Sequence, residues 1–271
     1  MKILITGGNG FIASNLKNKL LNHEITTISR TDFDLRSTND TDAFFKDKHF
    51  DVVLHTAIVG GNRLVEDTKD CVHDNAIMAQ NLLKNKKYWN RLIHFGSGAE
   101  LDRAQDIQGN TNNFFNRFPE DPYGLSKNVI CRMFYGYSNI YNLRIFNVFA
   151  ENEAERRMIK SNIKNYISDQ PIIIHQDKYM DFLYIDDFAK IVELYLEGKN
   201  LPKEIDCVYE TKLKLSDIAN IINNLSAKKV PIEINSSDLG KSYCGHFEPI
   251  CNTLNFIGIE QSICNVYESI L

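Results

Sequence analysis

The sequence predicts an α/β protein with a doubly wound parallel sheet, followed by a smaller α/β domain. Three observations support this prediction. Short, almost unbroken apolar runs of strand length alternate with amphipathic runs of helix length over the first 150 residues. The first apolar run ends in a glycine-rich turn that opens a helix. Beyond that region the alternation loosens into shorter mixed elements, which are typical of a small additional domain.

Size and composition restrict the class of protein. The 271 residues, 43% of them hydrophobic, suffice for one large α/β domain or for a nucleotide-binding domain with a small annex. The formal net charge of -4 argues against a nucleic-acid partner. Met1 leads directly into the first apolar run and no long apolar span follows, so we expect a cytoplasmic protein without a membrane segment. The 6 cysteines form no C-x-x-C pair, which predicts reduced thiols and no metal site.

The first strand and its turn predict a dinucleotide site. The apolar run Lys2–Thr6 suits a strand buried on both faces, and the amphipathic run that starts at Phe11 suits a helix. Gly7 permits a tight turn between them, and Gly10 lets a pyrophosphate approach the backbone N–H groups of the helix start. A plain structural turn is the alternative. The predicted cofactor ligands here are Gly7, Asn9, Gly10, Phe11 and Ile12.

The second strand, Glu24–Ser29, indicates which dinucleotide binds. An acidic residue after this strand favours NAD, because it holds the ribose hydroxyls. Ser29 and Arg30 stand there instead, and a hydroxyl with a guanidinium suits the additional phosphate of NADP. NADPH is therefore the predicted cofactor, rather than NADH, although Asp32 complicates this and a solvated Arg30 is the alternative. Asp34 and Leu35 are expected against the adenine.

The remaining elements predict two domains. The strand Asp51–His55 is followed by Thr56 and Ala57, which we place at the carboxyl edge of the sheet, where ligands bind. Further strands are expected at 91–95, 142–146, 171–174, 182–185, 205–209 and 230–234, and helices at 75–83, at 186–196, from 122 and from 216. Residues 101–119 are predicted to form a long polar loop, which is a candidate lid over the site. We expect a nucleotide-binding domain of Rossmann type at 1–150, with 181–200 returning to it, and a substrate-binding domain from 151–180 and 201–271.

A tyrosine and a lysine on one helix predict proton-transfer chemistry. Asp121 and Pro122 are a favourable helix start, and Tyr123 and Lys127 then share one helix face. A nearby ammonium lowers the phenol pKa from its usual value near 10, and Lys127 can also bind the nicotinamide ribose. Tyr123 then protonates an alkoxide as hydride arrives. Ser97, after a sheet strand, is placed to hold the substrate carbonyl oxygen.

With these motifs in hand, the chain resembles the extended short-chain dehydrogenase/reductase family of the NAD-dependent epimerase/dehydratase type. The resemblance covers residues 1 to about 200. Within the family, the pattern of the chain is similar to that of nucleotide-sugar 4-ketoreductases such as CDP-abequose synthase and GDP-fucose synthase. It is carried by Thr6-Gly7-Gly8-Asn9-Gly10-Phe11-Ile12, His55-Thr56-Ala57, Val59-Gly60-Gly61, Gly96-Ser97, Tyr123-Gly124-Leu125-Ser126-Lys127, Arg144-Ile145-Phe146-Asn147-Val148 and Asp181-Phe182-Leu183-Tyr184-Ile185-Asp186-Asp187.

The resemblance implies an oxidoreductase that acts on a nucleoside-diphosphate sugar. It further implies a homodimer built from the helices Asn75–Leu83 and Tyr123–Tyr137. In the family, the segment Asn147-Val148 borders the nicotinamide carboxamide and the substrate. Asn75 either holds a group near the site or caps its helix.

Departures from the family pattern restrict the reaction. Dehydratases of the family place Asp-Glu directly after the serine or threonine, where this chain has Gly98 and Ala99. GDP-fucose synthase uses a cysteine for epimerisation at the position of Ala99. Ser97, Tyr123 and Lys127 remain, and these suffice for hydride transfer alone. Glu100 is expected on the loop surface.

The substrate diphosphate also needs a cation. Relatives often carry an arginine just before Asp181, where this chain has Met180. Arg156, Arg157, Lys160 and Lys178 are the local candidates, and Arg157 and Lys160 would share a helix face. The predicted substrate-binding residues are Ser97, Gly98, Asn147, Arg157 and Lys160.

The predicted function is NADPH-dependent reduction of the 4-keto group of a nucleotide-linked 4-keto-6-deoxy sugar, in polysaccharide biosynthesis, with Tyr123 as proton donor. A nucleotide-sugar 4-epimerase with tightly bound NAD is the alternative enzyme, against which Arg30 and the short carboxyl-terminal domain argue. A non-catalytic NADP-binding regulator is the alternative of another class. Such proteins usually lose the tyrosine or the lysine, and both are present here.

Overall fold

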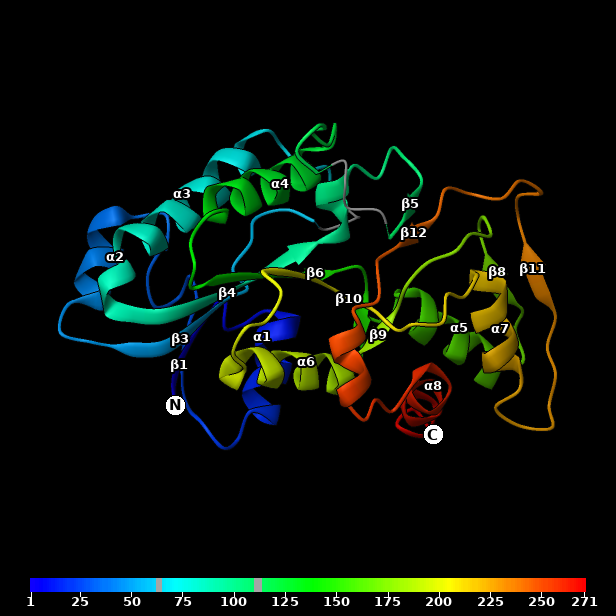
Figure 1. Cartoon of the computed structure of the whole chain (residues 1–271). Coiled ribbons are helices and arrows are strands. Elements are labelled where there is room, and N and C mark those ends of the chain that lie inside the picture. The colour runs from blue at the N-terminus through cyan, green and yellow to red at the C-terminus, as the bar shows by residue number, and fades with distance from the viewer. Residues whose placement is uncertain (62–64, 110–113) are drawn as a thin grey trace. The chain divides into compact units, whose positions relative to one another are not determined.

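The computed structural model (Figure 1) describes residues 1–61, 65–109 and 114–271. The chain divides into two compact units. Unit 1 consists of Met1–Ala104, Thr111–Ile145 and Val192–Asp206, and unit 2 consists of Gln105–Asn110, Phe146–Ile191 and Cys207–Leu271. The loop predicted at 101–119 is described only in part, because 110–113 lie outside the described residues. Its proposed role as a lid stays a prediction.

Unit 1 is built on a six-stranded sheet with the order β10-β6-β4-β3-β1-β2. The strands are β1 Lys2–Thr6, β2 Glu24–Ile28, β3 Phe50–His55, β4 Trp89–Ser97, β6 Ile140–Ile145 and β10 Glu204–Cys207. The pairs from β2 through β6 run parallel. The chain adds β2 on one side of β1 and β3 on the other, so the strand order reverses at β1. This is the doubly wound α/β fold predicted from the sequence. In such folds, ligands bind at the carboxyl ends of the strands where the order reverses, here β1 and β3.

Helices cover both faces of this sheet (Figure 1). They are α1 Phe11–Lys19, α2 Thr38–Phe45, α3 Asp70–Lys84 and α4 Pro122–Phe134, with short 3-10 turns η1 Lys86–Tyr88 and η2 Gly98–Leu101. Side chains of α2, α3 and α4, among them Phe45, Leu82 and Phe134, form one core with Leu4 and Leu92 of the sheet. On the other face Tyr195, near the end of α6, packs edge-on against Tyr141.

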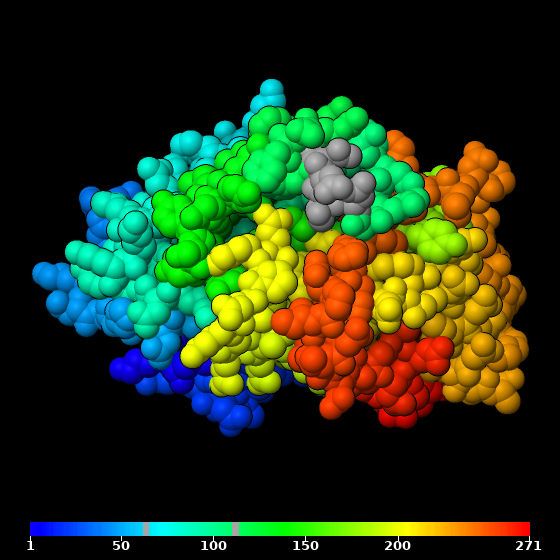
Figure 2. All heavy atoms as spheres, viewed as in Figure 1, coloured from blue at the N-terminus to red at the C-terminus, as the bar shows by residue number. Residues whose placement is uncertain are grey.

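Unit 2 contains three short two-stranded parallel sheets and a group of helices. Its elements are β5 Ile107–Gln108, β7 Val148–Phe149, α5 Met158–Ile167, β8 Ile172–Ile174, β9 Leu183–Tyr184, α7 Leu215–Asn223, β11 Ile232–Ile234, β12 Tyr243–Cys244, η3 Pro249–Thr253 and α8 Ile259–Glu268; α6 Ile185–Glu197 begins here and ends in unit 1. The helices α5, α7 and α8 pack against one another. Figure 2 shows the red residues of the C-terminus next to the gold residues of α7.

Several element boundaries differ from the sequence predictions. The helix expected from Asn75 begins at Asp70, five residues earlier. The strand expected at 205–209 within the small domain is β10, and it joins the large sheet as its sixth strand beside β6. Asp186, expected to cap a helix, lies within the first turn of α6. Within the described parts of the chain, no helix is both long and apolar enough to cross a membrane.

Candidate active site

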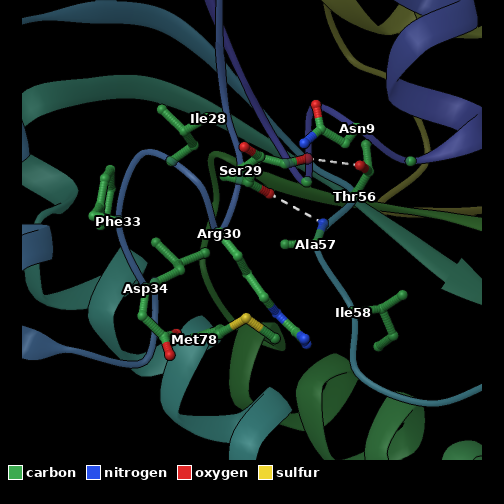
Figure 3. A pocket seen from close by; sticks show the side chains of 14 residues that line it. Asn9, Ile28, Ser29, Arg30, Phe33, Asp34, Thr56, Ala57, Ile58 and Met78 are labelled. Carbon is green, nitrogen blue, oxygen red and sulfur yellow. Dashed lines mark hydrogen bonds between the residues drawn. The ribbon is translucent and has the colours of Figure 1, made fainter.

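A cavity of about 400 Å³ lies at the carboxyl ends of β1, β2 and β3 (Figure 3). Its wall contains nine residues predicted to bind the cofactor: Gly7, Asn9, Gly10, Ser29, Arg30, Asp34, Leu35, Thr56 and Ala57. Phe11 and Ile12 are in the first turn of α1, outside the described wall of this cavity. The sequence analysis did not predict Thr6, the last residue of β1, as a cavity residue. It also missed the apolar wall residues Ile28, Phe33, Ile58 and Met78, because such residues carry no motif.

The glycine turn closes tightly against β3. Gly7 has a positive φ of 70°, and a Cβ atom on it would lie 2.8 Å from the Cα atom of Ala57. Only glycine fits both the backbone conformation and this contact. Gly10 is the N-cap of α1 and is held by a bond from its N–H to the carbonyl of Gly7, 2.8 Å long. Gly10, in the cavity wall, therefore places the start of α1 beside the space that a pyrophosphate would enter.

Arg30 points its guanidinium into the cavity (Figure 3). The Nη2 atom of Arg36 lies 2.7 Å from the carboxylate of Asp34. The hydrogen bond from Arg36 lowers the pKa of Asp34. Arg36 also pairs with Asp74. The negative charge of Asp34 is thus compensated by Arg36.

Ser29 is hydrogen-bonded to Asp32. Its hydroxyl donates to Asp32 over 2.9 Å, and its backbone N–H donates to the same carboxylate over 2.8 Å. Asp32 thereby organises the turn after β2 and occupies the hydroxyl that was expected to face a phosphate.

The residues predicted to be catalytic meet at the carboxyl end of β4. Ser97 is the last residue of β4, and its hydroxyl is hydrogen-bonded to the phenol of Tyr123. Tyr123 and Lys127 lie one turn apart on α4, whose start is capped by the Asp121 carboxylate accepting the N–H of Gly124. Lys127 is only 4% exposed, and its ammonium donates to the carbonyl of Phe95 over 2.6 Å.

The electrostatics of this group differ from the prediction in one respect. Burial raises the pKa of Tyr123, although the hydrogen bond with Ser97 lowers it, whereas the sequence predicted a lowered pKa from Lys127. Burial also lowers the pKa of Lys127, to about 8. The reason is that both side chains lose water on burial, which disfavours the charged form of each.

Two neighbours hold Tyr123 and its helix in place. Gly61, with a φ of 77°, lies against the Tyr123 ring, and a Cβ atom there would come within 2.6 Å of it. Asn75 is fully buried and binds both the N–H and the carbonyl of Val59, at 2.8 and 2.9 Å. Asn75 also donates to the hydroxyl of Ser126 on α4. Asn75 thus anchors a backbone segment beside the site and is not a helix cap.

The position of Glu100 differs from the one predicted. It was expected on the loop surface, but its side chain is fully buried and pairs with the guanidinium of Arg144. Glu100 also accepts a hydrogen bond from the N–H of Ser97 within a capping box. Arg144 extends the network to Glu204 and Asp206, at 2.7 and 2.6 Å. Glu100 therefore fastens the turn that presents Ser97, and Gly98 is buried in the same turn.

The predicted substrate residues of unit 2 have contacts of their own. The amide of Asn147 donates to the carbonyl of Asp181 over 2.8 Å, and Val148 pairs with Leu183 in the β7–β9 ladder. Lys160 is 8% exposed and donates to the carbonyls of Glu151 and Glu153.

Arg157 is more available than Lys160. It precedes α5, retains 39% side-chain exposure and contacts the carboxylate of Glu153 at 3.4 Å. Burial raises the pKa of Glu153 to about 7, against the opposing effect of Arg157. Of the two predicted cations, Arg157 is therefore the one with a side chain open to a ligand.

Comparison with known proteins places the chain in a family. The model of the NAD dependent epimerase/dehydratase family matches residues 3–207. Protein CapI of Staphylococcus aureus is 25% identical over 244 residues, which cover 75% of this chain and 72% of CapI. A putative UDP-glucose 4-epimerase of Methanocaldococcus jannaschii is 29% identical over 249 residues, or 80% of each chain.

Solved structures share the fold. A GDP-L-fucose synthetase from Naegleria fowleri superimposes with a TM-score of 0.82 at 15% identity and covers 99% of this chain and 92% of its own. A GDP-mannoheptose C4 reductase from Campylobacter jejuni with NADP bound gives 0.81 at 16% identity, with 99% and 98% covered. A UDP-glucuronic acid 4-epimerase from Bacillus cereus gives 0.80 at 22% identity, with 100% and 99% covered. Because the family model spans most of the sequence, the chain belongs to the NAD dependent epimerase/dehydratase family.

Proposed function

We propose that the protein is an NADPH-dependent reductase of the 4-keto group of a nucleotide-linked 4-keto-6-deoxy sugar. The observation that carries this proposal is the group formed by Ser97, Tyr123 and Lys127 at the carboxyl end of β4, in the same unit as a cavity walled by the glycine turn. The turn fits a dinucleotide, because Gly7 leaves no room for a side chain and Gly10, the N-cap of α1, is in the cavity wall. NADPH, when bound there, supplies hydride.

The roles of the side chains follow from their chemistry. The Ser97 hydroxyl binds the ketone oxygen of the substrate, and the Tyr123 phenol donates a proton to the same oxygen as negative charge develops on it. Lys127 stabilises the resulting phenolate and holds the cofactor ribose.

Neighbouring residues support reduction without a second reaction. Gly98 and Ala99 follow Ser97, and neither side chain can transfer a proton for dehydration or epimerisation. Arg30 supports NADPH over NADH, because its guanidinium points into the cavity next to the end of β2. The hydroxyl of Ser29 would have to leave Asp32 to contribute.

We extend the proposal to the substrate and the assembly. Arg157 binds the diphosphate of the nucleotide sugar, Asn147 lies beside the carboxamide and the sugar, and Lys160 holds the loop that carries Glu153. The protein acts in the cytoplasm in polysaccharide biosynthesis, as a homodimer through α3 and α4. Size-exclusion chromatography with light scattering tests the dimer, and Arg157→Ala tests the diphosphate contact through a raised KM for the sugar.

The test of the reaction is an NADPH oxidation assay with a panel of CDP-, GDP-, UDP- and dTDP-linked 4-keto-6-deoxy sugars. We expect stoichiometric oxidation of NADPH and a 4-hydroxy product with at least one of them. No oxidation with any member would contradict the reductase proposal.

A nucleotide-sugar 4-epimerase is the second candidate, favoured by the names of two relatives, from Methanocaldococcus jannaschii and Bacillus cereus. It requires an oxidised cofactor that stays bound through the cycle and a tyrosine that first acts as a base. The purified protein would then carry NAD, and it would convert a UDP-sugar without added cofactor. Chromatography of the nucleotide released on denaturation separates the two candidates.

A further inference from the structure

A row of polar side chains crosses the sheet of unit 1 beneath α4. Thr6, His55, His94 and Asn142 are neighbours in the register of β1, β3, β4 and β6, so their side chains project from one face. All four are buried, with exposures of 0%, 1%, 1% and 6%. The rings of the two histidines are 5.5 Å apart. We call these four residues the polar row.

The polar row contains buried atoms that the described residues leave unpaired. These atoms are Oδ1 of Asn142, both ring nitrogens of His94 and Nε2 of His55. Nδ1 of His55 is paired, with the hydroxyl of Thr6 at 2.9 Å. Buried polar atoms in proteins are normally paired with protein groups or with ordered water. These four unpaired atoms are therefore the positions at which ordered water would bond.

One end of the polar row reaches a cavity. A pocket of about 350 Å³ opens between the end of α4 and the β6–β10 edge of the sheet, and Asn142, Cys131 and Glu204 are in its wall. The amide of Asn142 donates to Glu100 and to the thiol of Cys131, which leaves its Oδ1 atom for another partner. This cavity is the entrance we assign to the row.

The other part of the row lies under Lys127. The ammonium of Lys127 donates to the carbonyl of Phe95, the residue after His94, and its charge contributes to the lowered pKa of both histidines. Burial is the larger cause, and it lowers the pKa of His55 to about 3. Phe134 lies edge-on to both rings and separates them from solvent on the α4 side. The charged and titratable groups around the row are Lys127 and Cys131 of α4, Glu100 of η2, Arg144 of β6 and Glu204 of β10.

We propose that the polar row, with water at its unpaired atoms, conducts protons from the α4–β10 cavity to Lys127 and so replaces the proton that Tyr123 gives to the substrate. The inference rests on the proposed function. Each turnover consumes NADPH, one ketone and one proton, and it forms NADP⁺ and one alcohol. The proton enters from solvent at Asn142 and passes across His94 and His55, which each accept it on one ring nitrogen and release one from the other. It reaches Lys127 and from there the Tyr123 phenolate, one helical turn away.

The chemistry of neutral imidazole fits this task. A neutral ring has one donor and one acceptor nitrogen, so it can pass a proton on without holding a charge. The strongly lowered pKa of both histidines keeps them neutral throughout the physiological range. The two histidines therefore act through Lys127 and do not touch the substrate.

The kinetic test uses His94→Phe, which keeps a ring of similar size and removes both nitrogens. In stopped flow with NADPH and a keto sugar, the first turnover should proceed at the wild-type rate, because Tyr123 starts protonated. Later turnovers should be slower by about tenfold or more. The result is a burst of one NADPH per site, with a larger solvent deuterium isotope effect on the slow phase.

Two further variants control this test. His49→Phe makes the same exchange at an exposed histidine that bonds Asn90, and it should show no burst. His94→Gln keeps hydrogen-bonding atoms in the row and should restore at least part of the steady-state rate. If His94→Phe slows the first turnover as much as the later ones, or changes neither, the proton path is wrong.

A second measurement does not depend on the substrate. A high-resolution crystal structure of the wild-type protein should show ordered water bonded to Oδ1 of Asn142 and to a ring nitrogen of His94. A row without water would overturn the inference even if the reductase reaction is confirmed. An inactive wild-type protein with a hydrated row would instead refute the proposed function, while the water in the row would still be confirmed.

Discussion

Two adjacent rows of one sheet face differ sharply in character. Leu4, Val53, Leu92 and Ile140 form an apolar row under α3 and α4. Two residues further along each strand, toward the carboxyl edge, the same face carries the polar row. Beyond the polar row come Glu100 and Arg144, a fully buried ion pair.

This difference separates stability from function. The apolar row removes side chains from water and stabilises the fold. Burying imidazoles, amides and charges costs free energy unless each is paired, and the polar row is not fully paired within the described residues. The polar side chains lie where the sheet meets Ser97, Tyr123 and Lys127. We infer that the carboxyl half of this face is specialised for the reaction, at the expense of stability.

The largest expected effect on stability comes from the buried ion network. Arg144→Met should lower the free energy of unfolding by about 3–5 kcal/mol, because Glu100 would remain buried without its cation. Chemical denaturation measures this loss. The double variant Arg144→Met with Glu100→Gln should recover much of it. A single variant as stable as the wild type would show that Glu100 is not held by Arg144.

Leu92→Ala tests the apolar row and should cost about 2–5 kcal/mol through the cavity that it leaves. The folded fraction should keep its kcat, because Leu92 is two residues from the polar row and bears no reacting group. Denaturation and a steady-state assay on the same preparation separate these effects. A large loss of kcat at unchanged stability would remove the distinction between the two rows.

The lowered pKa of Lys127 predicts that the free energy of unfolding depends on pH. Its pKa of about 8 in the folded chain is below the ordinary value of 10.5, so the unfolded chain binds more protons between these values. The wild type should therefore gain stability relative to Lys127→Met as pH rises through this window, by at most about 3 kcal/mol. Urea titrations at pH 7.5, 9 and 10.5 measure the difference. A difference that does not change with pH would place the Lys127 ammonium in a hydrated site.

The smallest expected effect concerns the cofactor. Arg30→Ala should raise KM for NADPH by about tenfold, which corresponds to about 1.4 kcal/mol, and should leave KM for NADH nearly unchanged. The exposed position of Arg30 keeps the effect modest. Asp32→Ala, made for comparison, frees the Ser29 hydroxyl. If Arg30→Ala raised KM for NADPH and KM for NADH equally, the basis for an NADPH preference would be removed.

Local patterns made part of the fold predictable. The glycine turn, the strands and the pair Tyr123 and Lys127 could be placed because each depends on neighbours within a few residues. Nine residues of the cavity at the ends of β1, β2 and β3 were predicted from the rule that ligands bind at the carboxyl edge of a parallel sheet. The family resemblance added the expected chain order of these parts.

Features that depend on tertiary contacts could not be predicted. The four residues of the polar row become neighbours only through the register of four strands. They are far apart in the sequence, so no local pattern predicts the row. Glu100 looked like a surface residue because its partner Arg144 lies 44 positions away. The environment of the phenol was also missed, since spacing shows that Lys127 is near Tyr123 but not how much water either side chain loses.

The measurement that tests the central claim most directly compares Tyr123→Phe with the wild type in NADPH binding and in turnover of a keto sugar. Removing the phenolic hydroxyl should leave the dissociation constant of NADPH and the melting temperature within error, because the cavity proposed for the cofactor is walled by other residues. Turnover should fall by about 10² to 10⁴-fold. A Tyr123→Phe protein that reduces the keto sugar at the wild-type rate would contradict the assignment of this site.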